Sequence, residues 1–129
     1  MGYKELDVWQ RSRQLVAEIY QMTEHFPPKE QFGLVSQMRR SAISLPANIA
    51  EGYGRRNPAD FARFLRIAKG SLNELETLCI LAEDLGFAND LEDLYENMNR
   101  LGMKLSNLQA KVLGTSSCVK EDSVDYHLE

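Results

Sequence analysis

Seven cationic side chains crowd into the middle of this 129-residue chain, and their type and spacing suit contact with an anionic partner. Residues 39–69 hold seven basic and two acidic side chains, a local charge of +5, whereas residues 70–129 hold four and twelve, a charge of −8. Clustered guanidinium and ammonium groups bind phosphate or carboxylate. The candidate nucleic-acid-binding residues are Arg39, Arg40, Arg55, Arg56, Arg63, Arg66 and Lys69.

A polar stripe accompanies the arginines of residues 37–56. Its members recur every three or four residues and therefore share one helical face: Arg40, Ser44, Asn48, Glu51 and Arg55. Apolar residues occupy the opposite face: Val35, Met38, Ala42, Leu45 and Ile49. This division predicts one packing face and one face that meets a partner, either an anionic molecule or another copy of the chain.

An interface or structural role is the second interpretation of these polar residues. Gly70 and Ser71 interrupt a helical pattern, which suggests close approach by another helix, within the bundle or between subunits. We group them with Ser44, Asn48 and Glu51. Glu51 and Asp60 are also placed to pair with the arginines, which leaves open whether the basic residues bind nucleic acid or make structural or subunit contacts.

The histidines do not support a metal centre. A di-iron bundle needs Glu-x-x-His pairs, but Met22 precedes His25 by three residues and Val124 precedes His127. Adjacent acidic residues elsewhere diverge on their helices and indicate a solvated face. We therefore expect no metal, no cofactor and no catalytic residue.

The cysteines and glycines give no sign of catalysis either. Cys79 lies in an apolar run and Cys118 in a polar tail, so both are expected to be free thiols, with Cys79 a small buried side chain. Residues 52–57 begin like a dinucleotide-binding motif, but the third glycine and the preceding strand are missing. The glycines of this segment instead predict a helix end with left-handed caps.

Four amphipathic segments account for most of the chain. They are expected over about 6–25, 29 or 31 to 53, 58–85 and 89–113. Pro27 and Pro28 end the first, Asn57 caps the third, Gly86 closes it, and Gly114 follows the fourth. Short connections and the lack of alternating strand patterns predict an all-α, antiparallel up-down-up-down four-helix bundle over residues 1–113. Residues 114–129 are expected to form a disordered tail.

The second and third helices each have an unusual feature. Pro46 either kinks the second helix or splits it, and we favour a kink because the apolar stripe continues in phase across it. The third helix carries a second apolar flank in addition to its main stripe, which predicts burial on two sides. That flank consists of Phe64, Ile67, Leu78, Leu81 and Leu85.

No apolar run approaches the roughly 20 residues that a membrane-spanning helix needs. The beginning, MGYKELDVW, lacks the pattern of a signal or transit peptide. We therefore expect a cytoplasmic protein without membrane association.

Ordered motifs give the chain a resemblance to a known family. They are Leu6-Asp7-Val8-Trp9-Gln10, Phe26-Pro27, Glu30-Gln31-Phe32-Gly33-Leu34, the runs 37–42 and 44–52, and Phe64-Leu65-Arg66-Ile67-Ala68-Lys69-Gly70-Ser71 with Glu74. From about Tyr3 to Leu113, the chain resembles the bacterial four-helix-bundle proteins named for reading frames in intervening sequences of large-subunit ribosomal RNA.

The resemblance implies assembly as well as binding. The family looks like bundles that form rings of five, and it is similar to the accessory protein of diversity-generating retroelements, which binds a reverse transcriptase and nucleic acid through a basic surface. This chain departs from those strongly basic proteins, since its net charge is −4. Our leading hypothesis is a non-enzymatic homo-oligomer, pentameric by resemblance, that binds RNA or DNA. The alternative is a protein-interaction scaffold, including a reverse-transcriptase accessory role.

Overall fold

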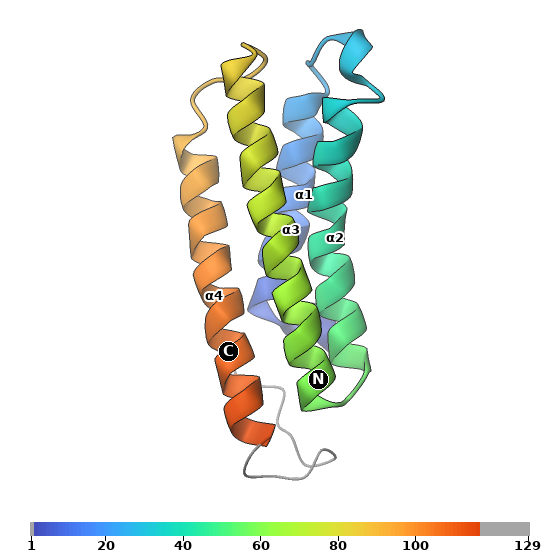
Figure 1. Ribbon diagram of the computed structural model, residues 1–129, viewed down its shortest axis with the longest axis vertical. Helices are drawn as coiled ribbons and strands as arrows, with labels where there is room; N and C mark the ends of the chain where they lie inside the picture. Colours follow the sequence, from blue (N-terminus) through green and yellow to red (C-terminus); the bar gives the residue numbers. More distant parts are fainter. Residues whose placement is uncertain (1, 117–129) are drawn as a thin grey trace.

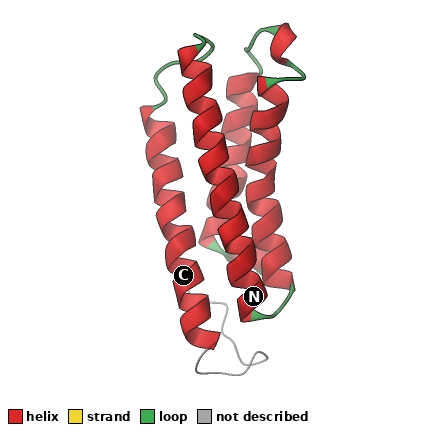
Figure 2. Ribbon diagram, viewed as in Figure 1, coloured by secondary structure: helices red, strands yellow, loops and turns green. Residues whose placement is uncertain are grey.

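The computed structural model describes residues 2–116. Prolines, glycines and an asparagine cap divide this part of the chain into helices, and it contains no strand (Figure 2). The elements are η1 (Tyr3–Glu5), α1 (Asp7–Thr23), η2 (Pro28–Glu30), α2 (Leu34–Gly54), α3 (Pro58–Asp84) and α4 (Glu92–Ser116). The sequence colours run upwards through α1 and α3 and downwards through α2 and α4 (Figure 1). The prediction of an all-α four-helix bundle is confirmed.

Each long helix contacts its neighbours in the chain, and α1 also contacts α4, which closes the bundle. Apolar residues from all four long helices fill the centre, as their helical spacing predicted. The largest fully buried side chains include Ile19, Met38, Leu45, Ile49, Phe61, Leu65, Leu75, Met98, Leu101 and Leu105.

The second apolar flank of α3 is only partly buried. Phe64 and Leu78 are buried, but Ile67, Leu81 and Leu85 are exposed at 41%, 44% and 59%. The prediction of burial on two full sides was therefore wrong, because α2 and α4 cover the inner part of α3 and leave a strip of its outer face to solvent.

Both ends of α3 follow the local rules that predicted them. The Asn57 side chain accepts a hydrogen bond from the backbone N–H of Asp60 at 3.0 Å, and Pro58 occupies the first turn. At the other end, Gly86 has a φ of 81°. Its N–H donates to the Glu83 carbonyl at 3.0 Å and the Phe87 N–H donates to the Ala82 carbonyl at 2.9 Å, which completes a Schellman motif.

Other helix ends differ from the predictions. Thr23 ends α1 two residues early, η2 precedes α2, and α4 begins at Glu92. Gly114 lies inside α4, which continues to Ser116. A glycine in a helix costs only about 1 kcal/mol, so it does not end one by itself. The tail predicted from residue 114 otherwise falls outside the described residues, as do Cys118 and His127.

Pro46 lies inside α2, which is one helix and not two. Proline cannot donate to the Ala42 carbonyl, but the apolar stripe on either side of it remains buried, at Ala42, Leu45 and Ile49. Tertiary packing therefore carries the helix through the missing hydrogen bond. A kink at this position stays a prediction.

Gly52 lies where α2 and α3 approach each other closely. A Cβ atom built on Gly52 would lie 2.5 Å from the Cβ of Phe64 and 3.2 Å from Cδ1 of Phe61. Real Cβ atoms do not approach this closely, so any larger residue would force the two helices apart. The left-handed glycine caps predicted here were wrong: Gly54 is helical, and Gly52 serves packing instead.

We expect Gly52→Ala to destabilise the fold by about 1–3 kcal/mol, because the added methyl group overpacks the α2–α3 contact. Urea unfolding followed by circular dichroism measures the effect. Gly70→Ala is the matched control, since a Cβ at Gly70 meets nothing within 4 Å and alanine favours the helix by up to about 1 kcal/mol. Equal stabilities of the two variants would contradict the assigned contact.

Candidate nucleic-acid interface

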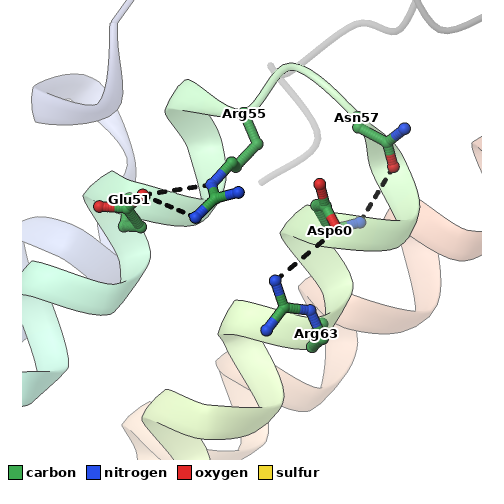
Figure 3. A network of polar contacts seen from close by, with 5 residues as sticks. All are labelled: Glu51, Arg55, Asn57, Asp60 and Arg63. Carbon is green, nitrogen blue, oxygen red and sulfur yellow. Dashed lines mark hydrogen bonds and ion pairs between the residues drawn. The ribbon is translucent and has the colours of Figure 1, made fainter.

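The turn from α2 to α3 brings three of the predicted arginines together. Arg55 and Arg56 follow the end of α2. Figure 3 shows Arg55 beside Glu51 and Arg63 on the second turn of α3. Gly52 sets this arrangement, since its contact with Phe64 holds the two helix ends against each other. We call Arg55, Arg56 and Arg63 the arginine cluster.

Two of these arginines pair with acids on their own helices. Arg55 contacts Oε2 of Glu51 through Nε at 3.2 Å and a terminal nitrogen at 3.1 Å, and Arg63 lies 3.8 Å from Oδ1 of Asp60. The four side chains are 40–54% exposed. Such pairs contribute at most about 1 kcal/mol, so a phosphate can displace the carboxylates at little cost.

Aromatic rings hold the guanidinium groups in place. The carbon centres of the Arg55 and Arg63 guanidinium groups lie 5.1 and 4.6 Å from the ring centroid of Phe64. Arg56 lies 5.3 Å from the ring of Tyr53. Each contact is worth about 0.5–1 kcal/mol at an exposed site. Two helices thus present three positioned planar cations at one end of the bundle.

Arg56 adopts a left-handed backbone conformation, with a φ of 55°. Side chains with a Cβ disfavour this region by about 1–2 kcal/mol. The position directly after the helix cap is where glycine is usually found. The chain therefore carries backbone strain within the arginine cluster.

Comparing two variants isolates this strain, because Arg56→Gly and Arg56→Ala both remove the guanidinium group. We expect the glycine variant to be more stable than the alanine variant by about 1 kcal/mol, since only glycine adopts positive φ without cost. Thermal unfolding of the two proteins measures the difference. An alanine variant as stable as the glycine variant would show that no strain resides at this position.

Arg39 is placed apart from the cluster. Sixteen residues, or about 24 Å of helix, separate it from Arg55. Its Nε donates to Oγ1 of Thr23 at 2.9 Å, a terminal nitrogen donates to the Tyr20 carbonyl at 3.4 Å, and the guanidinium lies 4.3 Å from the Tyr20 ring centroid. Arg39 therefore ties α2 to the C-terminal end of α1, where a cation also favours the helix dipole.

The remaining predicted cations are Arg40, Arg66 and Lys69. Arg40 is exposed on α2 next to Arg39, and Arg66 is exposed one turn beyond Arg63. Lys69 borders a groove of about 300 Å³ between α3 and α4, which Asn73 and Gly102 also line. No acidic side chain among residues 2–114 forms an ion pair with these three cations. Arg66 alone extends the arginine cluster along the outer face of α3.

The predicted polar stripe forms part of the seam between α2 and α3. The Ser44 and Ser71 hydroxyl groups hydrogen bond across the helices at 2.8 Å, and Nδ2 of Asn48 donates to the carbonyl and hydroxyl oxygens of Ser44, both at 2.8 Å. Glu51 belongs instead to the arginine cluster through Arg55. Gly70 faces open space, so the expected close approach by another helix of this chain was wrong there.

Lys4 and Arg13 form a second group of cations, which the sequence did not predict. Arg13 lies 5.6 Å from the Trp9 ring centroid on α1, and the Tyr3 ring meets Trp9 edge-on with centroids 5.4 Å apart. Lys4 lies beside them. The spacing of Trp9 and Arg13 by four residues was the available signal, but residues 1–38 carry no excess of basic side chains that would point to it.

Titratable groups outside these surfaces are arranged for stability. Burial raises the pKa of the Cys79 thiol to about 12, and the charges of Glu83 and Glu76 add to that effect. Burial also raises the pKa of Tyr95, whose hydroxyl donates to Glu83. These changes keep protons bound and generate no nucleophile. Within residues 2–116, no three His, Cys, Asp or Glu side chains gather in a way that would hold a metal ion.

Comparison with known proteins places the chain in a family. The profile described as 23S rRNA-intervening sequence protein matches residues 4–107. The chain belongs to this family. A search of the curated proteins finds no match. The matched region covers η1 through most of α4 and includes every residue of the arginine cluster. No described helix of this family member has the length and apolar character needed to span a bilayer.

Proposed function

We propose that this member of the 23S rRNA-intervening sequence protein family is a non-enzymatic, cytoplasmic RNA-binding protein. The observation that carries the proposal is that Arg55 and Arg63, from either side of the α2–α3 turn, lie on the same Phe64 ring, with Arg56 next to Arg55 in the chain. Arg66 extends the same surface by one turn. The family description associates these proteins with ribosomal RNA genes, which is compatible with contact to nucleic acid.

Phosphate recognition is the chemistry that this surface supports. Guanidinium groups donate paired hydrogen bonds to phosphate oxygens, and an RNA backbone that displaces Glu51 and Asp60 gains charge-assisted contacts in place of weak exposed ones. The rings of Phe64 and Tyr53 hold the cations in position, so less side-chain entropy is lost on binding. The affinity then comes from phosphate contacts and carries little base specificity.

We expect the double variant Arg55→Ala/Arg56→Ala to bind a labelled RNA hairpin more weakly than the unaltered protein. The slope of log K against log salt should decrease in magnitude by about one to two, because two phosphate contacts are lost. Fluorescence anisotropy over a series of salt concentrations measures both quantities.

The matched control is Arg100→Ala. Arg100 makes the same type of exposed i,i+4 pair, with Glu96 on α4 at 3.3 Å, away from the α2–α3 turn. This variant should keep both the affinity and the slope, and the single variant Arg55→Ala should lose part of each. RNA binding that is absent, or that does not depend on salt, would reject the proposed function.

A protein-interaction scaffold is the second candidate, and the exposed apolar strip of α3 favours it. Ile67 and Leu81 lie on the same outer face as Gly70, which adds no side chain to that face. Exposed apolar side chains on this face, with Glu74 between them, suit a second copy of the chain, in a pentamer by family resemblance, or a protein partner such as a reverse transcriptase.

Light scattering distinguishes the two candidates. If the apolar strip joins subunits, Ile67→Glu should reduce the oligomer mass, because it places a charge in a contact that excludes water. Arg66→Glu, one residue earlier and also exposed on α3, controls for added negative charge. An unchanged mass of the Ile67 variant would exclude this strip as the subunit contact.

A further inference from the structure

A hollow on the outer side of α1 combines groups that the proposed RNA-binding surface does not use. It is an open depression of about 810 Å³, and a ligand in it would keep one side in solvent. Its lining residues are Lys4, Trp9, Gln10, Arg13, Gln14 and Ala17. None of these belongs to the arginine cluster, so this site and the proposed function can succeed or fail separately.

The indole of Trp9 supplies a fixed aromatic surface. Trp9 is half-buried and packs against the core, while the edge-on ring of Tyr3 and the guanidinium of Arg13 restrict its orientation. Tyr3 is itself anchored in η1, whose backbone joins α1 through the hydrogen bond from Leu6 N–H to the Tyr3 carbonyl at 3.0 Å. A planar ligand can therefore stack here without ordering a loose side chain.

Charge in the hollow is of one sign. Lys4 and Arg13 supply two cations, and none of the six lining residues is acidic. Glu18, which follows Ala17, lines a separate hollow with Arg11 and Asn97. The two acids between Lys4 and Trp9 in the sequence are engaged elsewhere as well. Glu5 accepts from the Gly2 N–H at 3.0 Å, and Asp7 pairs with Arg11 at 2.7 Å and with Lys104 of α4 at 3.1 Å. An anionic group in the hollow thus has two cationic partners and no carboxylate against it.

Two carboxamides complete the lining. Nε2 of Gln10 donates to the Lys4 carbonyl at 3.0 Å, which fixes this side chain and leaves its oxygen as an acceptor. Gln14 follows one turn later, and its amide has no hydrogen-bond partner among the side chains of residues 2–114. Carboxamides both donate and accept, as the edge of a nucleobase does.

We propose that the hollow on α1 binds a nucleotide. The base stacks on the Trp9–Arg13 pair, the phosphate meets Lys4 and Arg13, and the Gln10 and Gln14 amides contact the edge of the base. A bare phosphate would not use the indole, and an apolar ligand would leave both cations unpaired. The nucleotide is either free or one unstacked residue of an RNA strand, since both present the same groups.

The single tryptophan of the chain makes the test direct. Indole fluorescence, excited at the red edge of its absorption to avoid the nucleobase, should be quenched saturably by AMP. Adenosine, which lacks the phosphate, should bind about tenfold more weakly, as should AMP to Arg13→Gln. Inorganic phosphate should compete with AMP without quenching. A short single-stranded RNA that binds more tightly than AMP would identify an RNA residue as the ligand, and the reverse order would identify a free nucleotide.

Two controls keep the inference falsifiable. Arg100→Gln on α4 should leave the response to AMP unchanged, and equilibrium dialysis with labelled AMP checks Arg13→Gln without relying on indole emission. In the double variant Arg55→Ala/Arg56→Ala, AMP should still quench the indole fluorescence, even if the variant no longer binds the RNA hairpin. An indole signal that AMP does not change, or equal binding by the unaltered protein and Arg13→Gln, would overturn the proposed site.

Discussion

The contact between Gly52 and Phe64 determines what the α2–α3 end of the bundle can present. With no side chain at Gly52, the Phe64 ring lies against the backbone of α2 and remains within reach of residues after the end of that helix. Arg55 and Arg63 therefore flank one ring although they belong to different helices. A wider separation of the two helices would take Arg63 away from Arg55 and Arg56 and leave them as ordinary exposed arginines.

Several arginines of this chain lie over aromatic rings. Arg39 lies over Tyr20, Arg56 over Tyr53, and Arg13 over Trp9. These contacts have different consequences. Arg39 is also bound by a hydroxyl and a carbonyl group of α1, so its donors are used within the fold. The other guanidinium groups rest on rings and retain exposed surface for a ligand.

Local sequence rules predicted the helices and those helix ends that depend only on residues close by in the chain. Helical spacing identified the four long helices, Asn57 identified the start of α3, and Gly86 identified its end, because each signal acts within a turn or two of the chain. The roles of Gly52 and Gly54 could not be assigned in this way. Their difference depends on Phe61 and Phe64, which reach Gly52 only after two helices have packed.

The candidate sites show the same limit. Charge composition located the arginine cluster, but it also included Arg39, whose partner Thr23 lies on another helix. Conversely, Trp9 and Arg13 were overlooked because the net charge of residues 1–38 is close to zero, at four basic against five acidic residues. Summed charge conceals a cationic face when the acids, such as Asp7, are turned toward a different helix.

The connections at the two ends of the bundle differ in length, which decides where a fused domain or a surface anchor can be inserted. Only three residues, 55–57, join α2 to α3, whereas residues 85–91 join α3 to α4 at the opposite end of the rods (Figure 1). A fused domain or a surface anchor inserted in the longer connection would project away from the arginines. The shorter connection holds the end of α2 close to the start of α3, so the arginines of the two helices keep a fixed arrangement relative to each other.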